Sequence, residues 1–124
     1  MKFFLSFTAI IEALTGIGIL FFPGFLVSFL LQKKYDDVSV IIVAMVAGGA
    51  IISLATGSWL FRNNDSALTF SKVLLVYNAV IVVIVLFSSI NFEFASIPFF
   101  LIGGFHLFQT LWGLKLLLNK RVYN

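Results

Sequence analysis

The sequence predicts an all-α membrane protein: a bundle of four long helices running alternately up and down through the bilayer. Hydrophobic residues make up 61% of the chain and charged residues only 10%, whereas a typical soluble domain carries about 25% charged residues. The apolar residues fall into four runs, each long enough for the roughly 20 residues with which a helix crosses a ~30 Å hydrocarbon core. Strands of a membrane barrel would be about half as long and would alternate in polarity, which these runs do not.

The first apolar run extends from about residue 3 to residue 31. It follows Met1 and Lys2 as the core of a secretory signal would, but Glu12 interrupts it and no small-residue cleavage site closes it. We therefore expect an uncleaved first helix. Because Pro23 and Gly24 lie inside the run, this helix is expected to kink or break near Phe22, with a short second piece at the membrane interface.

The other three runs cover about residues 38–61, 67–90 and 95–118. The segments between the runs are short: residues 32–37, 62–66 and 91–94. Connections this short make consecutive helices antiparallel. The whole chain, residues 1–124, is therefore predicted to be a single transmembrane domain with an up-down-up-down order.

Basic residues lie mostly on one side of the predicted membrane. The side that holds both termini carries six of the eight Lys and Arg residues, namely Lys2, Arg62, Lys72, Lys115, Lys120 and Arg121. The opposite side carries Lys33 and Lys34. Cytoplasmic loops carry the excess of basic residues in membrane proteins, so both termini are predicted to be cytoplasmic. This topology, with such short loops, suits the inner (plasma) membrane of a bacterium.

Polar residues inside the runs gather at one predicted depth. At ~1.5 Å per residue, six of them fall about 12–18 Å from the cytoplasmic end of their helices: Glu12, Ser53, Tyr77, Asn78, His106 and Gln109. Hydrocarbon offers such groups no hydrogen-bond partners, so they are expected to face one another around a shared polar centre. We take these six residues as candidates for binding a ligand or a proton.

Each candidate also has a purely structural interpretation. Glu12 can be a neutral carboxyl that is hydrogen-bonded to a neighbouring helix, and Asn78 and Gln109 can hold helices together. A charged residue at mid-span costs at least ~2.5–3.5 kcal/mol, which favours a role for Glu12. Glu12 and His106 together can share a proton, pass one on, or act as acid and base on a lipophilic substrate.

Several chemistries find no support in the sequence. The chain has no cysteine and one histidine, so we expect no disulfide, no protein-built metal site and no cofactor. No aspartate lies inside a run and no phosphate-binding glycine motif is present, which leaves no basis for a Ser-His-Asp triad or a nucleotide site. The net charge of +3 comes from residues at the ends of the runs, so no nucleic-acid partner is expected.

Short motifs spread along the chain resemble a group of small bacterial four-helix membrane proteins that are distantly similar to DoxX-like proteins. The motifs are IEALTG at residues 11–16, Phe22 with Pro23, GSW at residues 57–59, Tyr77 with Asn78, and His106. These proteins are uncharacterised, so the resemblance implies the four-helix fold and no particular activity.

The position of Glu12 is also similar to that of the membrane-embedded glutamate of the small multidrug resistance transporters, which binds protons and cationic substrates. Those proteins have about this length and four helices. The lysine that they carry at the end of the first helix has no counterpart here, and the position of their third-helix tryptophan is taken by Asn78 or a neighbour.

The leading functional prediction is a non-enzymatic membrane protein that binds a lipophilic ligand or a partner membrane protein through an intramembrane polar cavity. Two alternatives stay open. One is a proton-coupled small-molecule transporter that uses Glu12, and the other is a membrane-embedded acid–base enzyme of the lipid-isomerase type. The expected partners are membrane lipids, a lipophilic ligand, and a second copy of the chain or another membrane protein.

Overall fold

The computed structural model describes residues 1–92 and 96–122, and all its regular structure is helical. Its helices are α1 (Lys2–Phe21), α2 (Pro23–Leu31), α3 (Val38–Phe61), α4 (Ala67–Asn91) and α5 (Ile97–Val122). The described ranges contain no strand, which confirms the all-helical prediction for them. The four long helices are each long and apolar enough to cross a membrane, a pattern typical of multi-pass membrane proteins.

The helix ends follow the local signals in the sequence. The first apolar run breaks at Phe22, whose amide still bonds to the Gly18 carbonyl, and Pro23 then begins α2, a position where its missing N–H costs nothing. The start of α3 is capped by Asp37, whose carboxylate accepts a 2.7 Å hydrogen bond from the Ser39 amide. Of the predicted loop at residues 91–94, Asn91 is the last residue of α4 and Phe92 caps it, while residues 93 and 94 lie outside the described ranges.

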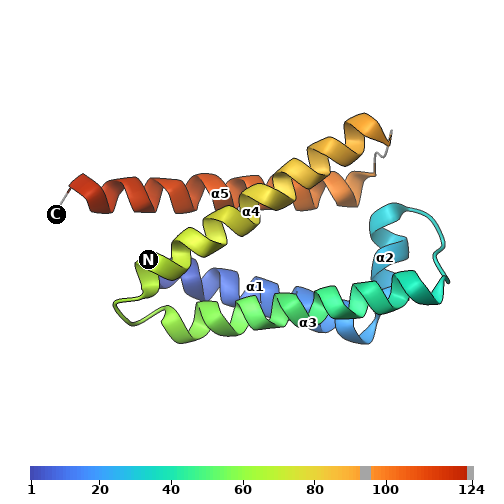
Figure 1. Ribbon diagram of the computed structural model, residues 1–124, viewed down its shortest axis with the longest axis horizontal. Coiled ribbons are helices and arrows are strands. Elements are labelled where there is room, and N and C mark those ends of the chain that lie inside the picture. The colour runs from blue at the N-terminus through green and yellow to red at the C-terminus, as the bar shows by residue number, and fades with distance from the viewer. Residues whose placement is uncertain (93–95, 123–124) are drawn as a thin grey trace.

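The long helices pack as two pairs, α1 with α3 and α4 with α5 (Figure 1). In the first pair the backbones approach closely at Gly16 and Gly48, where a Cβ added to Gly48 would lie 2.9 Å from the Gly16 carbonyl oxygen. In the second pair a Cβ added to Gly103 would lie 2.8 Å from Val85 Cγ1. Such small residues let membrane helices pack tightly.

Different elements fill the two ends of the space between the helix pairs. At the end that holds the N-terminus, Phe4, Leu5, Ala67 and Leu74 form a buried apolar cluster. At the other end the short helix α2 stands across the bundle (Figure 1) and packs against α1, α3 and α5. The Ser96 hydroxyl before α5 donates a hydrogen bond to the Leu30 carbonyl of α2.

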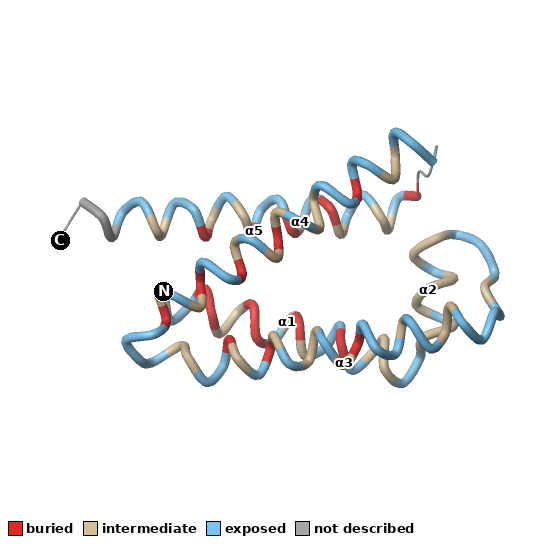
Figure 2. The backbone as a smooth tube through the Cα atoms, viewed as in Figure 1, coloured by how far each residue is buried: buried red, intermediate tan, exposed pale blue. Residues whose placement is uncertain are grey.

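Most of the outer surface of the long helices is exposed and apolar (Figure 2). Phe3, Ile90 and Leu101, for example, are 72%, 76% and 68% exposed. Soluble monomers rarely expose large continuous apolar surfaces. These faces are therefore suited to contact with lipid.

The inward face of α3 differs from the prediction. The sequence pattern placed Ser53 inward, but its side chain is exposed and its hydroxyl donates to the Gly49 carbonyl of the same helix. The buried positions of α3 are Gly48, Ala55 and Ser58. Because α3 is apolar all round, its sequence has no amphipathic signal to fix which face turns inward.

Candidate functional site

A cavity of about 390 Å³ lies between the two helix pairs, and all four long helices line it. Its size falls within the range of about 300–1,000 Å³ that is typical of small-molecule sites. Most of its wall is apolar, formed by Ile11, Ile19, Ile51, Ile81, Leu101, Ile102 and Phe105. Its polar lining consists of Glu12, Thr15, Tyr77 and His106.

Glu12 is the acidic group of this cavity. It sits on α1 one helical turn before Gly16, and only 3% of its surface is exposed. Its Oε1 has no hydrogen-bond partner among the described residues. Leaving a buried polar atom unbonded costs about 1–3 kcal/mol, and more for a charged group. The purely structural interpretation requires a hydrogen bond from a neighbouring helix to this carboxyl, and Oε1 has none among the described residues.

His106 on α5 is held in place by Asn78 on α4, through a 2.6 Å contact between His106 Nδ1 and Asn78 Oδ1. The Asn78 amide nitrogen donates to the Leu74 carbonyl at 2.7 Å, so its Oδ1 is the atom left to face the imidazole. Since Oδ1 can only accept, His106 Nδ1 carries the proton. In the neutral ring, Nε2 is then the acceptor that remains for a ligand.

Tyr77 lies one residue before Asn78 and also lines the cavity. Its ring packs edge-on against the His106 imidazole, with centroids 5.6 Å apart and an interplanar angle of 83°. Glu12 lines the same cavity from α1. The cavity therefore combines a carboxyl, a phenol and an imidazole, drawn from three different helices.

Three of the six predicted site residues do not line the cavity. Gln109 is fully buried but does not line the cavity; its amide nitrogen donates to the Thr8 hydroxyl at 3.2 Å, joining α5 to α1. Ser53 is exposed on α3, and the residue of that helix that reaches the cavity is Ile51. Asn78 acts behind the wall, through its bond to His106.

Two further parts of the lining were not among the six predicted site residues. Thr15 follows Glu12 by three residues, which places it on the same inward face of the helix, and it lines the cavity. The apolar part of the wall gave no signal, because its isoleucines resemble every other apolar residue of the four runs.

The lining suits an apolar molecule with a small hydrogen-bonding head. Tyr77 can donate through its hydroxyl, His106 can accept at Nε2, and Glu12 can accept or, when protonated, donate. Among the residues that the structure describes, no group of three or more His, Cys, Asp and Glu side chains is placed to hold a metal ion.

No protein-family model, curated protein or solved structure matches this chain. The function of the protein must therefore be inferred from the residues of its site and not from relatives. The fold and the site define a class: a small helical protein with four candidate membrane spans and a largely apolar cavity between two helix pairs.

Proposed function

We propose that the chain is a multi-pass protein of the bacterial inner membrane that binds a small lipophilic ligand in the cavity between its helix pairs. In this proposal the four long helices span the bilayer in up-down-up-down order, with both termini in the cytoplasm. Support for the orientation comes from the bias of basic residues toward the side of the termini. Support for insertion comes from the length and polarity of the helices and from their exposed apolar faces.

The observation that carries the ligand proposal is the unbonded, buried Oε1 of Glu12 on a cavity with a largely apolar wall. A carboxyl in such a place is costly to maintain unless a partner occupies the space beside it. Because all four long helices border the cavity and its volume is that of a small-molecule site, a small molecule fits it better than a second protein does. Its apolar body would contact the isoleucines, and its head would bond to Glu12, Tyr77 or the His106 Nε2.

The proposal can be tested by native mass spectrometry of protein that is extracted in a mild detergent. We expect the unaltered protein to retain a small-molecule adduct that Glu12→Leu loses. The expected loss of affinity is about 10-fold or more, the effect of removing one strong hydrogen bond to a buried charged or polar group. Ser53→Ala is the matched control, because Ser53 is a polar span residue outside the cavity, and it should retain the adduct.

Helical content and monodispersity must be equal in the variants, so that a lost adduct reports on the cavity. A second variant, Ile51→Phe, fills the wall without touching a polar group and should also release the adduct. The proposal is refuted if the unaltered protein carries no adduct, or if Glu12→Leu and Ile51→Phe retain the adduct as Ser53→Ala does.

The fixed tautomer of His106 favours an acid–base enzyme as the second candidate function. An imidazole with a protonated Nδ1 held by Asn78 offers Nε2 as a base, and Glu12 lines the same cavity as a group that can return a proton. An enzyme would convert the extracted ligand during incubation, and His106→Gln would stop the conversion while ligand remained bound. A transporter would instead move ligand across proteoliposome membranes in response to a proton gradient.

A further inference from the structure

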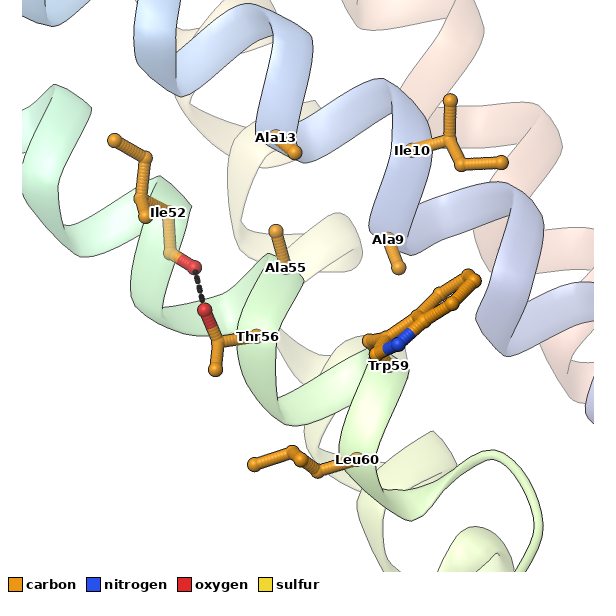
Figure 3. A pocket seen from close by; sticks show the side chains of 8 residues that line it. All are labelled: Ala9, Ile10, Ala13, Ile52, Ala55, Thr56, Trp59 and Leu60. Carbon is orange, nitrogen blue, oxygen red and sulfur yellow. Dashed lines mark hydrogen bonds between the residues drawn. The ribbon is translucent and has the colours of Figure 1, made fainter.

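A second hollow lies on the outside of the α1–α3 pair, on a different face of α1 from the one that carries Glu12. This groove has a volume of about 290 Å³. Three alanines, Ala9, Ala13 and Ala55, bring the two helices together along it, while Trp59 and Ile10 border it (Figure 3). We call it the outer groove.

Small side chains alone do not make a site, but one end of the outer groove carries a distinctive group. The Arg62 guanidinium lies over the Trp59 ring, 3.5 Å from its centroid, and Nη1 donates to the Trp59 carbonyl. Stacking on tryptophan orients an arginine and leaves most of its N–H groups available to an anion. Among the residues that the structure describes, Arg62 has no carboxylate partner. The ion pair between Lys34 and Asp36 lies just before the start of α3, at the opposite end from Arg62.

A second cation is placed at the same end. Residues 2, 6, 9 and 13 of α1 fall on one helical face, so Lys2 continues the line of Ala9 and Ala13 out of the groove. Because α1 and α3 are antiparallel, with Ala9 beside Trp59 and Ala13 beside Ala55 (Figure 3), Lys2 and Arg62 lie toward the same end. Like Arg62, Lys2 has no carboxylate partner among the described residues.

We propose that the outer groove binds one anionic phospholipid, with an acyl chain along Ala9, Ala13 and Ala55 and the headgroup phosphate on Arg62. The pattern of charge matches such a lipid: an apolar channel that leads, at the end of α3, to two unpaired cations. Arginine forms paired hydrogen bonds with phosphate oxygens, and anionic lipids are concentrated in the cytoplasmic leaflet. This inference rests on the proposed membrane insertion and topology, and it does not depend on a ligand in the inner cavity.

Trp59 provides a reporter within the groove itself. The chain has two tryptophans, so Trp112→Phe leaves Trp59 as the single tryptophan, which can be excited selectively. This protein is reconstituted into vesicles of phosphatidylcholine and phosphatidylglycerol in which either lipid carries brominated, fluorescence-quenching acyl chains. The extent of quenching by each brominated lipid gives the preference of the groove for phosphatidylglycerol over phosphatidylcholine.

We expect a preference of about fivefold, the effect of one Arg near an anionic membrane surface. Arg62→Gln should remove most of the preference and leave only what Lys2 provides, while Arg62→Lys should keep more of it. Lys33→Gln removes a cation at the opposite side of the predicted membrane and should leave the preference unchanged. Ala13→Leu fills the groove without altering a charge, and it should lower the preference.

Each contrary result overturns a defined step. An unchanged preference in Arg62→Gln refutes the phosphate contact, and an unchanged preference in Ala13→Leu shows general surface attraction in place of a groove site. Equal quenching by both lipids in the starting protein refutes the inference but leaves membrane insertion standing. If neither lipid quenches Trp59, the oligomeric state of the reconstituted protein decides the outcome. A monomeric protein would refute both membrane insertion and the lipid site, whereas a dimeric protein would show that a second copy covers the groove.

Discussion

The crossing of α1 and α3 makes a sharp prediction, because two adjacent glycines of α3 lie in opposite surroundings. A Cβ added at Gly48 would lie 2.9 Å from both the Gly16 carbonyl oxygen and the Leu20 amide nitrogen. These are backbone atoms, so they cannot move without moving α1. A Cβ added at Gly49 would meet nothing within 4 Å. Gly48→Ala is therefore expected to destabilise the protein, and Gly49→Ala is its matched control.

The magnitude follows from the geometry. Ordinary contact begins at 3.4 Å, so a Cβ at 2.9 Å requires the helices to separate by about 0.5 Å. Overpacking of this kind typically costs about 1–3 kcal/mol. The gain in helix propensity from Gly to Ala, about 0.8–1 kcal/mol, applies to both variants and cancels in their comparison. Gly48→Ala should be less stable than Gly49→Ala by about 1–3 kcal/mol.

The free energy of unfolding can be measured by titrating the protein from a mild detergent into dodecyl sulfate and following tryptophan fluorescence and helical content. Both variants are compared with the unaltered protein in the same detergent. If the two variants are equally stable, or if Gly49→Ala is the less stable, the face of α3 that we describe as packed against α1 is wrong.

Two further predictions concern the α4–α5 pair. Gly103→Ala should destabilise the protein less than Gly48→Ala does, because its Cβ would meet Val85, a side chain that can shift. Adding Val85→Ala to Gly103→Ala should restore the lost stability. Gly104→Ala, whose Cβ would meet nothing within 4 Å, should not reduce the stability in the same titration. A double-mutant cycle with Asn78→Ala and His106→Ala should give a coupling energy of about 0.6–1.7 kcal/mol, as polar contacts between membrane helices do. A coupling energy near zero would contradict the Asn78–His106 hydrogen bond, from which the tautomer of His106 is inferred.

Most helix boundaries could be predicted closely, because they depend on local signals; α5 is the exception, since it runs to Val122 and past the predicted end at residue 118. α3 starts at Val38 and ends at Phe61, as the apolar run indicates, and the first run breaks where Pro23 requires it. The common level at which polar residues of different helices meet was also predictable, since it needs only the rise per residue of a helix. Thus Glu12, Tyr77 and His106 line one cavity.

The rotation of each helix was harder to predict than its length. In α1 and α5 the polar residues are few and spaced on one face, so Glu12 and His106 point inward. In α3 small residues occur on several faces, and the choice between Gly48 and Gly49 depends on the shape of α1, with Gly16 opposite. A serine costs little on an exposed apolar surface when its hydroxyl bonds to its own helix, as Ser53 does. The polarity of Ser53 therefore did not show whether its side chain faces the inside or the outside of the bundle.

Glu12 and Gln109 show why burial and polarity alone do not define a binding site. Each has a buried side-chain oxygen without a partner among the described residues. Gln109 is packed between helices and satisfies its amide nitrogen through Thr8, so its unbonded oxygen is the cost of a contact that joins α5 to α1. Glu12 has open space beside it, with Tyr77 and His106 on the same wall. An oxygen in the first setting can be relieved only by repacking, whereas one in the second can be relieved by a molecule that enters.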